Sequence, residues 1–190
     1  NGAGHAQVIT NKFFSAILRI DVDQRPGNVL PNPHPANSTN YFIPADNPYV
    51  DVTNFNGRTF SATAVRTEFY SIGYRNPWRM SFDPATGFLY VADVGQDRYE
   101  EVSVITNGAN AGWAYYEGKQ LAKTLYPTQA TILTNPPAGL AFPIQDYAHG
   151  SGTFQGNSVS GGIVYRGSRI SQLYGAYVFG DYTSGNIWVL

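Results

Sequence analysis

Two short polar segments lie at the outer ends of a predicted β-hairpin, and their residue types suit ligand binding. Arg75 and Asn76 precede Pro77, so a permanent cation and an amide lie on a bend that proline stiffens. At the other end, an apolar strand leads into Asp93 and then Gly95, where the missing side chain lets a backbone carbonyl approach a ligand closely. A structural role is also open, in which Arg75 pairs with a carboxylate and Asn76 caps the turn.

The hairpin between these two ends is predicted from its turn. Residues 79–82 can extend, and residues 88–92 form an apolar, aromatic return strand. Between them, Asp83 can accept hydrogen bonds from the turn backbone, Pro84 presets φ, and Gly87 takes the position that needs a positive φ. A rigid hairpin therefore carries polar groups at both of its outer ends.

Further short strands indicate an all-β fold. Their predicted ranges are 14–22, 67–74, 100–105, 144–147, 161–166, 176–180 and 186–190. Residues 23–60 are rich in proline and asparagine, and we expect an ordered excursion over one face because aromatic and proline anchors are spaced along them. Residues 119–139 are the one candidate helical or irregular excursion, and their prolines limit any helix there.

Two segments share one pattern, which indicates repeated sheets. Residues 88–105 and 176–190 each contain an aromatic strand, an aspartate (Asp93 or Asp181), a turn with glycine and a second strand. The interval between the two aspartates corresponds to about two blades of a β-propeller at ~40–50 residues per blade. We therefore expect the two aromatic strands to occupy equivalent positions in separate four-stranded antiparallel sheets.

The composition argues against several classes of protein. Of the 190 residues, 13% are charged and 43% are hydrophobic, and the net charge of −1 gives no basic footprint for nucleic acid. No apolar run approaches the ~20 residues of a membrane-spanning helix. The absence of cysteine removes disulfides and thiol chemistry. The chain starts at Asn1 in the middle of a sequence pattern, so we expect an amino-terminal part to precede it. Asn37-Ser38-Thr39 matches the N-glycosylation sequon, and we interpret it as a surface turn that is not glycosylated unless the protein is secreted by a eukaryote.

The segment GYRNPWRMSFDPATGFLYVADVGQDRYEEV resembles the Arg-Asn-Pro hairpin of the glucose/sorbosone dehydrogenase family. Five other segments resemble this family in the family's order: AILRIDVD, YFIPADNPY, NAGWAYYEG, SVSGGIVYRG and LYGAYVFGDYTSGNIWVL. Members are six-bladed β-propellers, and many use pyrroloquinoline quinone (PQQ). The resemblance implies that residues 1–190 are a fragment of one propeller domain, about three to four blades long, from a periplasmic or secreted protein.

The resemblance also implies cofactor-binding residues. Arg75 and Asn76 would reach the quinone of PQQ, where the guanidinium would stabilise negative charge as hydride arrives. The backbone carbonyls of Gly95 and Gln96 would hold the Ca²⁺ ion that sits on the cofactor. Glucose dehydrogenases usually have proline at the second position, but a carbonyl ligand does not depend on its side chain.

A second, structural Ca²⁺ site is implied at Glu101 and the carbonyl of Ala111. Each would lie about 2.3–2.6 Å from the ion. The alternative is that Glu100 and Glu101 are the solvated start of a strand.

The resemblance also shows where this sequence departs from the family. The family's general base is a histidine that precedes every matched segment, so we assign no catalytic residue in this chain. His5 and His34 are predicted to be surface loop residues, and His149 could line the functional face without a catalytic role. Thr183 stands where glucose dehydrogenases have a lysine that pairs with a carboxylate of PQQ, which weakens the case for PQQ.

Two functions therefore stay open at this point. The first is a PQQ- and Ca²⁺-dependent dehydrogenase that oxidises a sugar and passes electrons to an acceptor. The second is a non-enzymatic propeller that binds a carbohydrate or protein partner through its loop-rich face.

Overall fold

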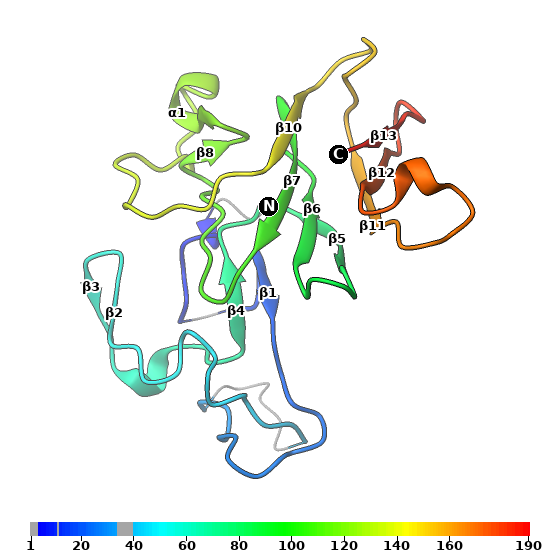
Figure 1. Ribbon diagram of the computed structural model, residues 1–190. Coiled ribbons are helices and arrows are strands. Elements are labelled where there is room, and N and C mark those ends of the chain that lie inside the picture. The colour runs from blue at the N-terminus through cyan, green and yellow to red at the C-terminus, as the bar shows by residue number, and fades with distance from the viewer. Residues whose placement is uncertain (1–3, 11, 34–39) are drawn as a thin grey trace.

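The computed structural model describes residues 4–10, 12–33 and 40–190, and these residues form a nearly all-β structure (Figure 1). This confirms the predicted fold class at the level of secondary structure. His34 and the sequon at Asn37 lie outside the described residues. Within the described part of the chain, no helix is both long and apolar enough to cross a membrane.

The largest sheet has four antiparallel strands in the order β10-β7-β6-β5. Its strands are β5 (Pro77–Phe82), β6 (Leu89–Asp93), β7 (Tyr99–Ile105) and β10 (Gln145–Ala148). All four were predicted to within a few residues. The long connection between β7 and β10 contains the strands β8 (Tyr116–Glu117) and β9 (Gln120–Leu121), followed by the short helix α1 (Ala122–Leu125).

The turn between β5 and β6 has the chemistry that its sequence predicts. The carboxylate of Asp83 accepts hydrogen bonds from the backbone N–H of Ala85 at 3.2 Å and from the hydroxyl of Thr86 at 2.6 Å. Gly87 closes the turn with a φ of 75°, a conformation that side chains disfavour. The turn fixes the register from Phe82 opposite Leu89 to Arg79 opposite Ala92, and a register shift between Arg79 and Pro77 then brings Pro77 opposite Asp93.

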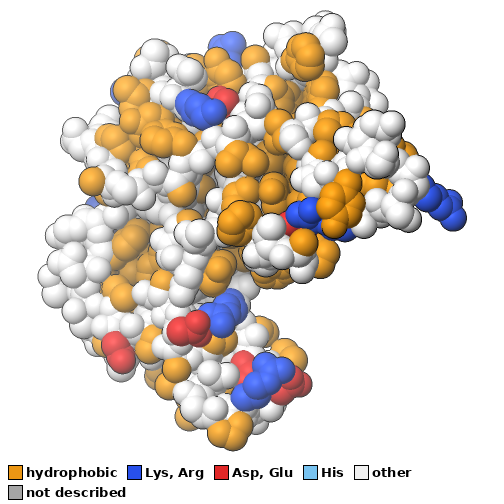
Figure 2. All heavy atoms as spheres, in the orientation of Figure 1, with side chains coloured by type: hydrophobic (Ala, Val, Ile, Leu, Met, Phe, Trp, Pro, Cys, Tyr) orange, Lys and Arg blue, Asp and Glu red, His pale blue; other side chains and the backbone are white. Residues whose placement is uncertain are grey.

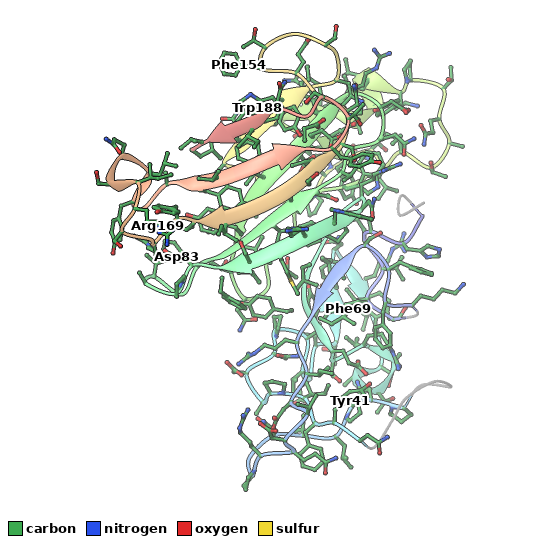
Figure 3. All side chains as sticks on the ribbon, turned by 90° about the vertical axis from the view of Figure 1, so that its right-hand side faces the viewer. Tyr41, Phe69, Asp83, Phe154, Arg169 and Trp188 are labelled. Atoms are coloured by element: carbon green, nitrogen blue, oxygen red, sulfur yellow. The ribbon has the colours of Figure 1, made fainter. Side chains whose placement is uncertain are left out.

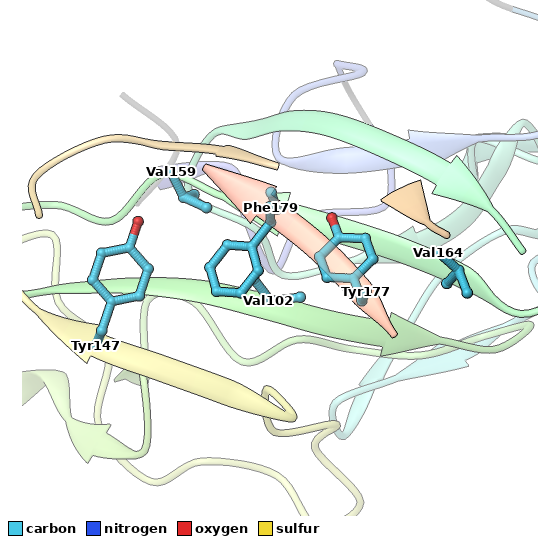
Figure 4. Packing of buried hydrophobic residues seen from close by; sticks show 7 residues of the cluster. Val102, Tyr147, Val159, Val164, Tyr177 and Phe179 are labelled. Atoms are coloured by element: carbon cyan, nitrogen blue, oxygen red, sulfur yellow. The ribbon is translucent and has the colours of Figure 1, made fainter. Parts of the chain in front are cut away.

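A second sheet of three antiparallel strands packs against the first. It consists of β11 (Val159–Val164), β12 (Tyr177–Asp181) and β13 (Ile187–Val189), with β12 in the middle. The rings of Tyr90 and Tyr177 stack between the two sheets with centroids 4.6 Å apart. Figure 4 shows the shared core, which contains Ala92, Val102, Tyr147, Val159, Val164, Tyr177 and Phe179.

The aromatic strands β6 and β12 thus lie in separate sheets and do not pair with each other, as predicted. Two details differ from the expectation. The second sheet has three strands, and it packs directly on the first although the sequence interval suggested two blades. The interval is long because β8, β9, α1 and irregular connections occupy much of it.

The amino-terminal part forms a smaller unit around the pair β1 (Ala16–Leu18) and β4 (Phe69–Ile72). β1 is shorter than the predicted strand because Asp21 pairs with Phe42 in the long excursion instead. The excursion ends in the small hairpin of β2 (Asn54–Phe55) and β3 (Arg58–Thr59).

Several large apolar side chains stay exposed on the strand β5 at the edge of the four-stranded sheet. Trp78, Met80 and Phe82 are all more than half exposed, and Figure 2 shows hydrophobic side chains gathered on one face of the molecule. Among the described residues the sheets do not close into a ring, so the number of blades stays a prediction.

Candidate functional site

Asp93 at the end of β6 joins the two polar ends of the hairpin. One oxygen of its carboxylate accepts the backbone N–H of Arg75 at 2.8 Å, and the other accepts the N–H of Asn76 at 2.6 Å. The N–H of Val94 donates in return to the carbonyl of Asn76 at 3.0 Å. Antiparallel pairing of β5 with β6 brings these residues together, so the bend that carries Arg75 is held rigidly against the end of β6.

The burial of Asp93 has an electrostatic cost. Its side chain is buried in the sheet, and this burial raises its pKa to about 7, although the N–H groups of Arg75 and Asn76 oppose the shift. The two hydrogen bonds that this carboxylate accepts offset part of that cost and fix the shape of the bend.

The side chain of Arg75 lies over the loop that follows β6. Its Nε donates to Oε1 of Gln96 and its Nη1 donates to the carbonyl of Val94, both at 3.3 Å. Among the described residues its guanidinium makes no ion pair, so its direct partners are neutral. The alternative that Arg75 pairs with a carboxylate is therefore wrong for its side chain, and the cation stays available to an anionic group.

The backbone of the loop after β6 is held by hydrogen bonds to Glu117 on β8. Oε1 of Glu117 accepts hydrogen bonds from the backbone N–H groups of residues 96–99, at distances between 2.7 and 3.1 Å. The hydroxyl of Tyr126 binds its other oxygen. Gly95 begins this loop where a β-carbon would lie 1.6 Å from the carbonyl oxygen of Tyr99. The loop therefore needs glycine at this position for steric reasons.

The predicted structural Ca²⁺ site at Glu101 and Ala111 stays a prediction. Glu101 is buried and accepts the N–H of Gly118 at 2.6 Å, and Ala111 is buried as well. Burial, and then the nearby charge of Asp93, raises the pKa of Glu101 well above its ordinary value. Within the described residues no group of three or more His, Cys, Asp or Glu side chains could hold a metal, so backbone carbonyls and water would have to supply most ligands.

The alternative of a solvated strand start at Glu100 and Glu101 is wrong, because both side chains are buried. Glu100 is bound by Nε2 of His149 at 2.6 Å and by the N–H of Val159 at 2.8 Å. This places His149 in a contact between β7, β10 and β11. His149 ties the end of β10 to β7 within the four-stranded sheet, and the N–H of Val159 links Glu100 to the three-stranded sheet.

Asp181 at the end of β12 repeats the arrangement at Asp93. Its carboxylate accepts the N–H groups of Thr183 at 3.0 Å and Ser158 at 2.8 Å, and the hydroxyl of Tyr147 at 2.8 Å. Thr183 is exposed on the resulting turn. The position at which the resemblance implies a lysine is thus a solvent-facing, uncharged residue in this structure.

Sequence reasoning missed Glu117 and Tyr126. Glu117 lies in the segment NAGWAYYEG, which matched the family, but no spacing rule connects a glutamate on one hairpin with four amides some twenty residues earlier. The signal that could have found it is the run of polar residues at 96–98, which follows a strand and whose N–H groups need partners.

Comparisons with known proteins give matches in sequence and in fold. The sequence model of the family described as Glucose / Sorbosone dehydrogenase matches residues 39–190. The HIPL2 protein of Arabidopsis thaliana is 35% identical over 183 residues, which cover 93% of this chain and 24% of that protein. The Hedgehog-interacting protein of Homo sapiens is 25% identical over 178 residues, which cover 94% of this chain and 19% of that protein. This chain therefore spans about a quarter or less of these relatives.

Among solved structures, the PQQ-bound aldose sugar dehydrogenase of Streptomyces coelicolor is similar to this chain. Its TM-score is 0.55 at 18% sequence identity, and the match covers 98% of this chain and 38% of that chain. At this identity the similarity concerns the fold alone.

Proposed function

Because this chain belongs to the glucose/sorbosone dehydrogenase family, we propose that the full-length protein is a quinoprotein that oxidises a sugar hydroxyl. The single observation that carries this proposal is the pairing of Arg75 and Asn76 with the loop of Gly95 and Gln96 through the carboxylate of Asp93. We also propose that the sheets are part of a six-bladed propeller and that the protein is periplasmic or secreted.

The residues at this site fit PQQ and Ca²⁺. The Arg75 guanidinium has only neutral direct partners and can bind a carbonyl or carboxylate oxygen of the cofactor. The carbonyl oxygens of Gly95 and Gln96 accept no hydrogen bond from the described residues, so both can bind a cation. Ca²⁺ takes 6–8 oxygen ligands, so the cofactor and water would complete its shell.

Each residue then has a defined task. PQQ, when bound, supplies the quinone that takes up hydride from the sugar carbon. The guanidinium of Arg75 would stabilise negative charge on a cofactor oxygen, and the carboxylate of Asp93 keeps the backbone of Arg75 and Asn76 in place. Since His149 is bound to Glu100, we place the general base that takes the hydroxyl proton outside these residues.

A second candidate function is a propeller that binds a carbohydrate or protein partner without catalysis. The observation that favours it is Thr183, which offers no charge to a cofactor carboxylate. The similarity to Hedgehog-interacting protein points the same way, because that name describes a protein partner.

Isothermal calorimetry separates the two candidates. The full-length protein is titrated with PQQ in buffer that contains Ca²⁺, and the quinoprotein proposal expects a dissociation constant in the micromolar range or below. The variant Arg75→Ala is titrated in the same way. Arg169→Ala, which also removes an arginine but an exposed one, is its matched control. If wild type shows no heat of binding at micromolar concentrations, the quinoprotein proposal fails and the binding-module candidate replaces it.

A further inference from the structure

The carboxylate of Glu117 lies at the centre of an unusual set of backbone donors. One of its oxygens accepts the N–H groups of Gln96 at 2.7 Å, Asp97 at 3.1 Å, Arg98 at 3.0 Å and Tyr99 at 3.1 Å. Consecutive N–H groups that converge on one point form an anion-binding concavity. Here the anion is part of the protein and its side chain is fully buried.

Because each peptide unit is planar, these hydrogen bonds also fix the direction of two carbonyl groups. The N–H of Gln96 shares a planar peptide unit with the carbonyl of Gly95, and the N–H of Asp97 shares one with the carbonyl of Gln96. Both peptide bonds are trans, so each carbonyl points opposite to its N–H partner. Since both N–H groups point at Glu117, the carbonyls of Gly95 and Gln96 must point away from it.

Glu117 also has contacts outside the loop that it organises. Glu117 lies on β8, and the hydroxyl of Tyr126 binds its second oxygen from the segment after α1. The loop offers little packing of its own, because Asp97 and Arg98 are exposed. The four amides of the loop therefore converge on Glu117, which lies on a different hairpin, and the N–H of Asp97 also donates to the hydroxyl of Tyr126 at 3.1 Å.

We propose that Glu117 is a positioning residue that turns the carbonyls of Gly95 and Gln96 toward the cofactor site. It contacts neither cofactor nor substrate, and it acts by fixing two peptide planes before the ligand arrives. This inference rests on the proposed function, because it assumes that those carbonyls bind the Ca²⁺ of a PQQ complex. Preorganisation of this kind lowers the cost of ordering the loop upon binding.

Amide hydrogen exchange of the full-length protein tests the structural half of this inference without any ligand. We compare Glu117→Ala and Glu117→Gln with Glu68→Gln, a matched control whose carboxylate is also buried but binds Tyr41. Residues 96–99 should exchange at least about tenfold faster in Glu117→Ala, because four amides lose a charged acceptor. Glu117→Gln keeps a neutral acceptor of the same shape, so its effect should be smaller but in the same direction.

Calorimetric titration with PQQ in Ca²⁺ buffer tests whether the order that Glu117 gives to the loop strengthens cofactor binding. Glu117→Ala should weaken PQQ binding about tenfold or more relative to Glu68→Gln, if the loop must be ordered on binding. Unchanged exchange at residues 96–99 in both Glu117 variants would overturn the inference. So would faster exchange with unchanged PQQ affinity.

The failure of the proposed function has a different signature. In that case wild type and Glu68→Gln both bind no PQQ, which refutes the cofactor site, whereas the exchange rates still show whether Glu117 fixes the loop. Because Glu117→Gln preserves the size of the side chain, it keeps the test decisive even if Glu117→Ala does not fold.

Discussion

The guanidinium of Arg166 binds the carboxylate of Asp83 through two hydrogen bonds, at 2.9 and 2.6 Å. Arg166 follows β11 in the three-stranded sheet, and Asp83 begins the turn of the β5–β6 hairpin, so the pair ties the two sheets together. In Figure 3, Asp83 lies beside the loop that carries Arg169. The guanidinium carbon also lies 5.2 Å from the centre of the Tyr174 ring. A two-pronged contact of this kind restrains the angle between the sheets.

Replacing Arg166 by alanine should lower the melting temperature by several degrees. The hydrogen bonds from Arg166 hold the pKa of Asp83 well below its ordinary value, so the ionised carboxylate stabilises the folded state. This contribution is present above the ordinary carboxyl pKa of about 3.9 and is lost as the pH falls toward the lowered pKa. Thermal unfolding should therefore show a large difference between wild type and variant at neutral pH, which shrinks below about pH 4. Arg169→Ala is the control, and a gap that does not change with pH would contradict the prediction.

Arg75→Ala in the full-length protein should lower the rate of sugar oxidation by about 10²–10³, the usual effect of removing one group that stabilises transition-state charge. Folding should change little, because Asp93 is held by the backbone of Arg75 and not by its side chain. The measurement is the steady-state rate with saturating PQQ and Ca²⁺, with Arg169→Ala as the surface control. Equal rates in the two variants would remove Arg75 from the site.

The sequence predicted the fold best where local chemistry decides the structure. The turn at Asp83 and Gly87 fixes the β5–β6 hairpin, and antiparallel pairing brings the outer ends that carry Arg75 and Asp93 together, although the register shift between Arg79 and Pro77 was not predicted. The contacts of Glu117 could not be predicted in the same way. They join a short hairpin to a loop some twenty residues away, and no periodic pattern records such a contact.

The charged start of β7 was harder to predict for another reason. Two adjacent glutamates at the start of a strand point to opposite faces, and charged side chains there are usually solvated, yet both side chains are buried. Their partners come from distant segments, namely His149, Val159 and Gly118. Burial of charge is decided by such long-range hydrogen bonds, which a single sequence does not reveal.

Gly95→Ala should disrupt the loop after β6 more than its small change in size suggests. The new β-carbon would lie 1.6 Å from the Tyr99 carbonyl oxygen, and this backbone atom cannot move without breaking the bonds to Glu117. We expect a loss of about 1–3 kcal/mol in unfolding free energy together with a loss of PQQ binding. Gly180→Ala is the control, because its nearest contact would be at 3.5 Å. Denaturant unfolding that gives equal stabilities for both variants would show that the loop is more adaptable than the structure indicates.

Removal of Ca²⁺ should destabilise the protein through the buried charge of Glu101. Its carboxylate is buried, and nearby Asp93, Glu117 and Asp146 add repulsion that raises its pKa. A bound Ca²⁺ would relieve this repulsion, so chelation should lower the melting temperature of wild type. Glu101→Gln keeps an acceptor for the N–H of Gly118 but removes the charge.

Glu101→Gln should therefore be at least as stable as wild type in the presence of chelator. Added Ca²⁺ should raise the stability of this variant only slightly. For wild type, saturation at about 100 times the dissociation constant would stabilise the fold by about 2.7 kcal/mol. Glu68→Gln, remote from this cluster, should keep the full response. If Ca²⁺ stabilises Glu101→Gln as strongly as wild type, the ion does not bind at Glu101. A wild type that is insensitive to chelation would remove the structural Ca²⁺ site altogether.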